Sequence, residues 1–299
     1  TDEVFGVGIG SFAEYAVASA AKIAPKPANL TFPQAAAIPI AALTALQAIR
    51  DRAEVREEQT VLVVGASGGV GSFAAQIASA FGARVTGVCS TAKVDMVRAL
   101  GVDEVIDYRF DDFADRTRRY DAIIDVGGNS SLSRLRRALS PRGTLVIAGG
   151  ETDGRLLAGA GRQVRALTIS PFLRQRLRTV LCSHNREDLI VLTKLIESGR
   201  VAPVVGTSFA LGEAPAFCVE RHEGSVGEHH GTLVPSPDRD RPQAAAALDL
   251  DRPIGLERAD LPDPRVVVEA ATDRPLILDE RRAEPEFRAR ARTLRLHAR

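Results

Sequence analysis

The feature that most constrains this chain is a glycine-rich loop directly after a short apolar stretch. A strand buried on both faces is expected at Val61-Leu62-Val63-Val64, because the stretch is apolar throughout. The loop that follows is Gly65-Ala66-Ser67-Gly68-Gly69-Val70-Gly71, and a helix is expected over residues 70–82. Strand, glycine loop and helix in this order are typical of a turn that holds the pyrophosphate of a dinucleotide.

Glycine has a separate purpose at three points of this loop. Gly65 permits the tight turn, Gly68 lets the backbone approach the pyrophosphate, and Gly71 lets the helix pack closely on the strand. We expect the pyrophosphate on the amides near Gly69 and Val70, where unpaired N–H groups and the helix dipole favour an anion. The weaker alternative is a glycine-rich turn that binds nothing.

Strands and helices alternate after the loop, which predicts parallel strands joined by right-handed crossovers. The expected fold is α/β, a Rossmann doubly wound parallel sheet. Further strands are expected at residues 84–89, 104–107, 122–125, 144–148 and 201–210, and helices at 93–100, 131–139 and 186–198.

The end of the second strand favours NADPH over NADH. NAD-binding sheets place a carboxylate there to hold the ribose 2′-hydroxyl, but the first acid in this stretch is Asp95. Ser90 offers a hydroxyl and Lys93 a cation, which suit a 2′-phosphate, and Tyr108 could close over it. Each has a structural alternative: Ser90 as a helix N-cap, Lys93 as a solvated helix residue, and Tyr108 as a surface aromatic.

Four stretches follow one another along the chain: GSFAEYAV, IAPKPANLTFPQAAAIPIAALTALQAI, VLVVGASGGVGSFAAQIASAFGARVTGVCS and ALGVDEVIDY. In this order they resemble the medium-chain dehydrogenase/reductase superfamily, in its zinc-independent, quinone-oxidoreductase-like branch. The similarity runs to about residue 215, and its segment from VTGVCS to VIDY is similar to the reticulon-interacting mitochondrial protein group.

The resemblance implies remnants of a GroES-like β-rich catalytic domain, NADPH as cofactor, and hydride transfer to a quinone, an enal or a related carbonyl compound. Thr44 would lie behind the nicotinamide. Gly127 is expected to let the cofactor ribose pass closely. The residues that match cofactor contacts of the family are Gly69, Val70, Ser90, Lys93 and Tyr108.

The expected domains follow from this comparison. Residues 1–44 would be the end of the catalytic domain, 45–180 the NADP-binding Rossmann domain, and 181–234 the return to the catalytic domain. Residues 235–299 contain eight of the sixteen prolines, and we expect a disordered or out-of-frame tail that adds no stability. The family-like pattern degrades after Ala216, so a reading-frame change is expected near Phe217 or Cys218. The sheet of the catalytic domain would then lack its closing strand. Because the chain starts at Thr1, we also expect it to be N-terminally incomplete.

No metal site is expected. Ile40 stands where zinc-dependent relatives have a cysteine ligand four residues before the threonine that matches Thr44. Cys89, Cys182 and Cys218 are far apart in the sequence and are expected to be buried thiols, which fits a reducing cytoplasm. No catalytic acid or base is identified, because Tyr120 and Asp125 are better explained as structural residues.

Composition excludes some partners. The net charge is +1, with 45% hydrophobic and 26% charged residues, so neither nucleic acid nor a membrane is expected as a partner. A small-molecule carbonyl or quinone substrate and a homodimer are the expected associations. The alternative functions are a non-catalytic NADPH-binding or interaction protein, since one fold serves many purposes, and an inactive, truncated gene product.

Overall fold

The structure is a computed structural model of the 299-residue chain. It describes residues 2–11, 15–115, 117–128, 130–148, 161–170 and 173–206, with the first two residues of the helix at 161 described by backbone alone. It also describes the backbone of three short strands: Phe209–Ala210 (β9), Pro235–Ser236 (β10) and Arg265–Glu269 (β11).

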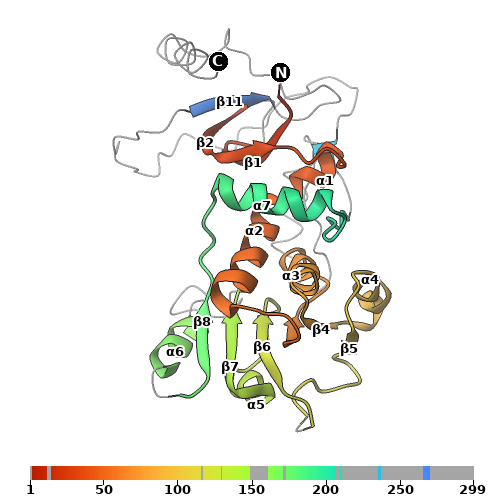
Figure 1. Cartoon of the computed structure of the whole chain (residues 1–299), viewed down its shortest axis with the longest axis vertical. Coiled ribbons are helices and arrows are strands. Elements are labelled where there is room, and N and C mark those ends of the chain that lie inside the picture. The colour runs from red at the N-terminus through yellow and green to blue at the C-terminus, as the bar shows by residue number, and fades with distance from the viewer. Residues whose placement is uncertain are drawn as a thin grey trace.

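A six-stranded parallel sheet forms the centre of the larger part of the molecule (Figure 1). Its strand order is β5-β4-β3-β6-β7-β8, and every neighbouring pair is parallel. The predicted α/β doubly wound fold is therefore confirmed. The strands are β3 (Thr60–Val64), β4 (Arg84–Cys89), β5 (Glu104–Asp107), β6 (Tyr120–Asp125), β7 (Leu139–Ile147) and β8 (Arg176–Thr179).

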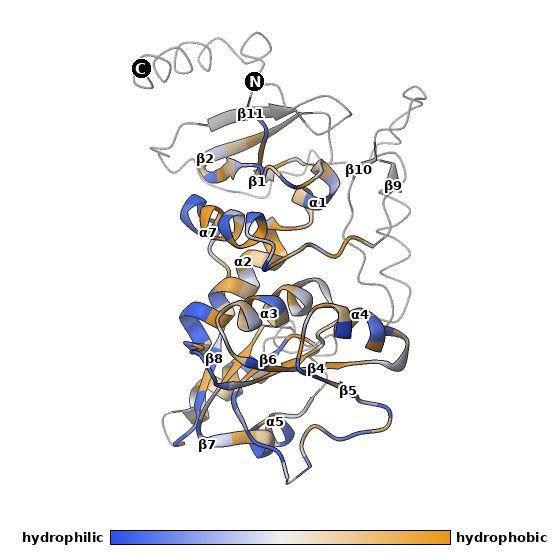
Figure 2. Ribbon diagram, turned by 45° about the vertical axis from the view of Figure 1, so that its right-hand side comes forward, coloured by the Kyte–Doolittle hydropathy of each residue, from blue (hydrophilic) through white to orange (hydrophobic). Residues whose placement is uncertain are grey.

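Helices cover both faces of this sheet because its strands are apolar on both sides. In β3, Val61 and Val63 face one hydrophobic cluster, and Leu62 and Val64 face the other. Figure 2 shows that hydrophobic residues are concentrated in the sheet and in α2. The first cluster holds α2 (Pro39–Gln47), α3 (Gly69–Ala80) and α7 (Arg186–Glu197), and the second holds α5 (Leu132–Ala138) and α6 (Gly161–Ile169).

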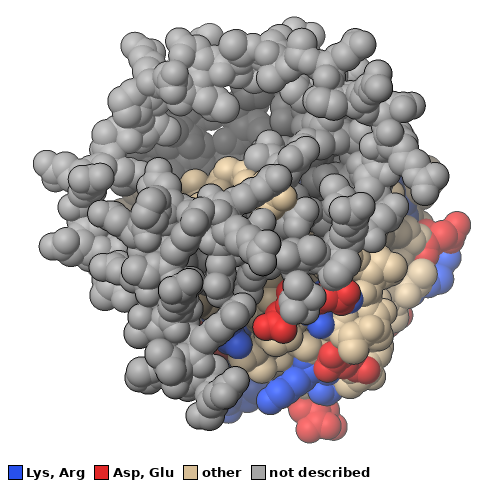
Figure 3. Space-filling view, turned by 90° about the horizontal axis from the view of Figure 1, so that it is seen from above, with Lys and Arg blue, Asp and Glu red and all other residues tan. Residues whose placement is uncertain are grey.

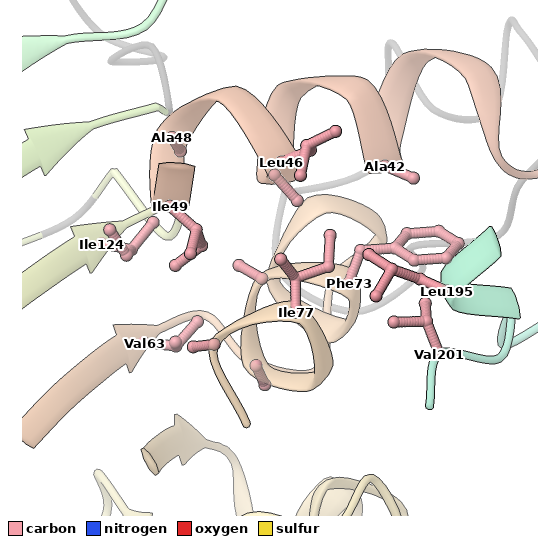
Figure 4. Close-up of a cluster of buried hydrophobic side chains, with 14 of the residues drawn as sticks. Ala42, Leu46, Ala48, Ile49, Val63, Phe73, Ile77, Ile124, Leu195 and Val201 are labelled. Carbon is pink, nitrogen blue, oxygen red and sulfur yellow. The ribbon is translucent and has the colours of Figure 1, made fainter. Parts of the chain in front are cut away.

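Helix α2 is central to the first cluster (Figure 4). Its Leu46 is fully buried near Phe73 and Ile77 of α3, and Leu195 of α7 lies on the same side. The helix continues into a π-helical turn, η1 (Ala48–Ala53), which ends at Glu54 with a left-handed φ of 55°. The Ala-rich stretch is interrupted at Pro39, as expected. A shorter helix, α1 (Phe32–Ala36), ends before Pro39, and α2 begins at Pro39.

A second, antiparallel sheet lies at the other end of the molecule (Figure 1). Its order is β1 (Val4–Ile9), β2 (Tyr15–Pro25) and β11. Strand β11 pairs with β2 from Arg265↔Ser19 to Glu269↔Tyr15. We expected a tail without strands and an unpaired sheet edge. Residues 265–269 contradict both expectations, because their run of valines forms a strand that pairs with β2. The proposed frame change at Phe217 or Cys218 lies outside the described residues.

Three details of the secondary structure differ from expectation. Residues 201–206 form no strand, because Pro203 lacks an N–H group and the side chain of Gln76 binds both backbone groups of Ala202. Strand β7 begins at Leu139, earlier than predicted. Strand β8 was not predicted, because its sequence RLRT alternates charged and apolar residues in a very short run.

The described surface carries mixed charge. Seen from above, Lys and Arg side chains lie among Asp and Glu side chains (Figure 3). Within the described ranges, no helix is both long and apolar enough to span a bilayer.

Candidate functional site: the carboxyl edge of the parallel sheet

The predicted phosphate loop lies between the end of β3 and the start of α3. Gly65 has a φ of 85°, and a Cβ atom added there would lie 3.0 Å from the backbone nitrogen of Gly127. A Cβ atom added to Gly71 would lie 2.0 Å from the carbonyl oxygen of Gly65. Both glycines are therefore required by the packing of the loop on itself and on the end of β6.

Gly69 has a different environment from these two glycines. Among the described residues, a Cβ atom added there would meet only the Cβ atom of Ala41, at 3.7 Å. Gly69 is also the first residue of the twelve-residue helix α3, and its N-cap, Gly68, has no side chain to bind the amides of the first turn. An uncapped helix N-terminus with open space beside it fits the pyrophosphate of a dinucleotide.

Backbone hydrogen bonds join the loop to the neighbouring strand ends. The amides of Gly65 and Ala66 both donate to the carbonyl oxygen of Val88, at 3.1 and 3.0 Å. The amide of Gly127 donates to the carbonyl oxygen of Val64 at 3.1 Å. Ala66 is fully buried, whereas Ser67, Gly69 and Val70 are half-buried. The loop is thus held against the ends of β4 and β6, and its outer part is accessible.

Ser90 lies immediately after β4, at the N-cap of a 3-10 turn, η2 (Thr91–Lys93). Ser90 therefore has the N-cap position of the structural alternative, but its side chain makes no capping hydrogen bond. Lys93 is exposed and has no ion-pair partner among the described residues. The carboxylate of Asp95 is 2.8 Å from a guanidinium nitrogen of Arg98 and is paired with it.

Tyr108 follows β5, which pairs with β4 on the side away from β3. Its amide donates to the carbonyl oxygen of Cys89 at 3.1 Å, and its side chain is 53% exposed. The structure therefore brings Ser90, Lys93 and Tyr108 to neighbouring strand ends at one corner of the sheet, beside the phosphate loop. The amide of Lys93 also donates to the carbonyl oxygen of Ser90 at 2.9 Å, which fixes this turn.

Thr44 is nearly buried in α2, and its hydroxyl donates to the carbonyl oxygen of Ile40 at 2.8 Å. Ile40 is 55% exposed at the start of the helix. The neighbouring Ala41 is the residue that approaches Gly69. The start of α2 thus lies next to the phosphate loop, on the catalytic-domain side.

A polar network between α2 and α7 was not predicted from the sequence. The buried carboxylate of Asp188 accepts hydrogen bonds from Arg50 at 2.6 Å and from Gln47 at 2.8 Å. Gln47 also donates to the carbonyl oxygen of Ser183 at 2.7 Å. Asn185, which follows a loop and precedes the helix, is the N-cap of α7, a position that the sequence could have indicated. The long-range pairing of Asp188 with Arg50 has no local signal.

This network determines the charge state of Asp188. Burial opposes ionisation, but hydrogen bonds from Arg50, Gln47 and Asn185 outweigh it and lower the pKa of Asp188 below the ordinary carboxyl value. Hydrogen bonds to Asp51 and, second, to Asp188 raise the pKa of Arg50. Both groups are therefore charged at neutral pH and fix α7 against α2.

The candidate acid–base residues do not form a pair. Tyr120 begins β6 and Asp125 ends it, so they lie at opposite edges of the sheet. Burial raises the pKa of the Tyr120 hydroxyl. The structural roles that the sequence favoured for Tyr120 and Asp125 stay a prediction.

The two described cysteines are poor nucleophiles. Burial, with Asp107 nearby, raises the pKa of the Cys89 thiol to about 11. Burial also raises the pKa of Cys182, although this side chain is only half-buried, which differs from the expected full burial. Cys218 lies outside the described residues.

A zinc ion does not fit the described residues, which contain no group of three His, Cys, Asp or Glu side chains able to hold a metal. At position 40 the apolar Ile40 cannot act as a ligand. Both facts concern only the part of the chain that the structure describes.

Comparison with known proteins identifies the family. A family described as zinc-binding dehydrogenase matches residues 100–216. The structure of a quinone oxidoreductase from Coxiella burnetii superposes with a TM-score of 0.64 at 30% identity, covering 76% of this chain and 70% of that chain. The chloroplastic quinone-oxidoreductase QR1 of Triphysaria versicolor is 30% identical, over 77% of this chain and 70% of the relative. The chain belongs to the medium-chain dehydrogenase/reductase superfamily. Within this superfamily it is similar to quinone oxidoreductases.

A third relative agrees with the resemblance seen in the sequence. The mouse mitochondrial NAD(P)H oxidoreductase RTN4IP1 is 34% identical over 235 residues. The match covers 72% of this chain and 59% of the mouse protein, so the chain spans about three fifths of that relative's length.

Proposed function

We propose that this medium-chain dehydrogenase/reductase is a zinc-independent, NADPH-dependent oxidoreductase that transfers hydride to a quinone, an enal or a related carbonyl compound. The observation that carries the proposal is the open space at Gly69, in front of the uncapped N-terminus of α3. The names of the similar quinone oxidoreductases support the substrate class.

In this proposal the chain's own residues bind and orient the cofactor. The amides near Gly69 and Val70 bind the pyrophosphate, and Ser90 and Lys93 bind the 2′-phosphate. Gly127 leaves room beside the loop for the ribose. When bound, NADPH supplies the hydride, and the protein contributes position and a site of low polarity.

The choice of NADPH rests on the end of β4. The hydroxyl of Ser90 makes no capping bond, the ammonium group of Lys93 has no described ion-pair partner, and Asp95 is paired with Arg98. A 2′-phosphate therefore meets an available donor and an available cation at this corner. A cytoplasmic location and a homodimer remain proposals from the sequence.

The experiment is turnover by the purified chain with a soluble quinone, followed by the absorbance of the reduced cofactor. We expect NADPH to be oxidised faster than NADH, at the same rate before and after treatment with a chelator. Binding without oxidation of NADPH would favour the non-catalytic alternative. Loss of turnover on chelation, restored by zinc, would overturn zinc independence.

A further inference from the structure

An open surface pocket, here called the cavity, lies at the amino edge of the parallel sheet, opposite the proposed cofactor site. Its volume is about 410 Å³, which is within the range of small-molecule pockets (roughly 300–1,000 Å³). The phosphate loop follows the carboxyl end of β3, whereas this cavity adjoins the starts of β7 and β8 and the end of α5. Its lining residues are Ser133, Arg136, Arg137, Pro141, Leu173, Arg174 and Gln175.

The lining is strongly cationic for a chain with a net charge of only +1. Three of its described lining residues are arginines, and none of the described ones is acidic. They come from two separate segments, since Arg136 and Arg137 belong to the last turn of α5 and Arg174 precedes β8. Figures 1 and 2 both show α5 at the end of the molecule away from β1 and β2.

A structural explanation accounts for two of these arginines only. Cations in the last turn of a helix interact favourably with the helix dipole, and this interaction alone would explain the presence of Arg136 and Arg137. It does not account for Arg174, which is outside any helix. Asp112, the acid that interacts with Arg137 through space, forms its ion pair with Arg134 at 2.8 Å. Among the described residues, neither Arg137 nor Arg174 has an ion pair of its own.

Gln175 organises the wall of the cavity. Its amide nitrogen donates to the carbonyl oxygens of Arg136 at 2.9 Å and of Leu139 at 3.3 Å. Its amide oxygen accepts a hydrogen bond from Nε of Arg136 at 3.1 Å. Gln175 thus forms hydrogen bonds with carbonyl oxygens that would otherwise repel an anion. It also orients the guanidinium group of Arg136 by accepting a hydrogen bond from its Nε.

We propose that this cavity binds the phosphate group of a small organic phosphate through Arg136, Arg137 and Arg174. The planar fork of a guanidinium group matches the oxygens of a phosphate, and several such forks around one cavity select an anion of high charge. The site is separate from the proposed cofactor site and does not depend on the proposed function.

The test is calorimetric titration of the full chain with inorganic pyrophosphate, with Gly69→Ala present in the parent and in every variant so that the proposed pyrophosphate site of the phosphate loop is blocked. The cavity variant combines Arg137→Gln with Arg174→Gln, which keeps the contact between Arg136 and Gln175. The matched control combines Arg56→Gln with Arg84→Gln, two exposed arginines outside the cavity with the same change of charge. Thermal melting followed by circular dichroism reports whether each variant is folded.

We expect the cavity variant to bind pyrophosphate about tenfold more weakly or worse, as expected for lost hydrogen bonds to a charged group, and the control to bind like the parent. Absence of binding by the parent, equal binding by the cavity variant, or an equal loss in both variants would overturn the proposal. Succinate should bind more weakly than pyrophosphate, and equal or tighter binding of succinate would overturn the assignment to phosphate. If the cavity variant does not fold, Arg174→Gln alone should weaken binding, and unchanged affinity would again refute the site.

Discussion

Gly69 and Gly71 are two residues apart but have opposite structural requirements. A methyl group at Gly71 would overlap the carbonyl of Gly65, whereas one at Gly69 would make only an ordinary van der Waals contact with Ala41 among the described residues. We expect Gly71→Ala to lower the free energy of unfolding by about 1–3 kcal/mol through overpacking. Gly69→Ala should change stability by less than about 0.5 kcal/mol yet weaken NADPH binding tenfold or more, because the methyl group occupies the proposed pyrophosphate site. Denaturant unfolding and cofactor fluorescence measure the two effects. Full NADPH affinity in folded Gly69→Ala would show that the pyrophosphate does not lie there.

The charge of Lys93 should matter for NADPH and not for NADH. Lys93→Ala is expected to weaken NADPH binding by about 1.5–3 kcal/mol, because a hydrogen bond to a charged phosphate is lost. The matched control is Lys194→Ala, at an exposed position of α7. Fluorescence titration with both cofactors checks this. An equal loss for NADH would mean that Lys93 does not contact the 2′-phosphate.

Among the elements, α7 is fixed by one partly buried ion pair. Asp188→Asn should lower the free energy of unfolding by about 1–3 kcal/mol, because the partly exposed guanidinium group of Arg50 loses the Asp188 carboxylate and keeps only Asp51 among the described residues. The matched control is Asp95→Asn, which removes an exposed i,i+3 pair and should leave stability nearly unchanged. Urea unfolding of the three proteins gives the comparison.

The pair of Asp188 and Arg50 should stabilise the folded protein less as the pH falls. Because the folded-state pKa of Asp188 is lowered, its contribution is complete above the ordinary aspartate pKa of about 3.9 and is lost as pH falls through the folded-state value. The stability difference between the parent and Asp188→Asn should therefore shrink on going from about pH 6 to about pH 3. A difference that stays constant over this range would contradict a stabilising charge on Asp188.

Strand β11 covers an edge of β2 that would otherwise present unpaired backbone groups. We compare a chain ending at residue 269 with one ending at residue 264, which differ only in β11. The shorter chain should be less stable by roughly 1–3 kcal/mol, from the lost cross-strand hydrogen bonds. This replaces the expectation from composition that removing the whole tail costs nothing. Equal stability of the two chains would show that β11 adds nothing to the sheet.

For the whole molecule, the sequence was sufficient where local patterns determine structure. The apolar run at Val61, the spacing from Gly65 to Gly71 and the alternation of strands and helices predicted the sheet and its loop. Contacts between distant segments had no such signal. The pairing of Asp188 with Arg50, the binding of Ala202 by Gln76 and the partner of β11 depend on the tertiary fold, which local patterns do not encode.

The proposed cofactor site is the corner formed by the phosphate loop, Ser90 and Lys93. Fluorescence titration of the purified chain with NADPH and with NADH under the same conditions tests it. We expect saturable binding of both cofactors, with the tighter dissociation constant for NADPH. Equal affinities, tighter binding of NADH, or no binding of either cofactor would contradict it.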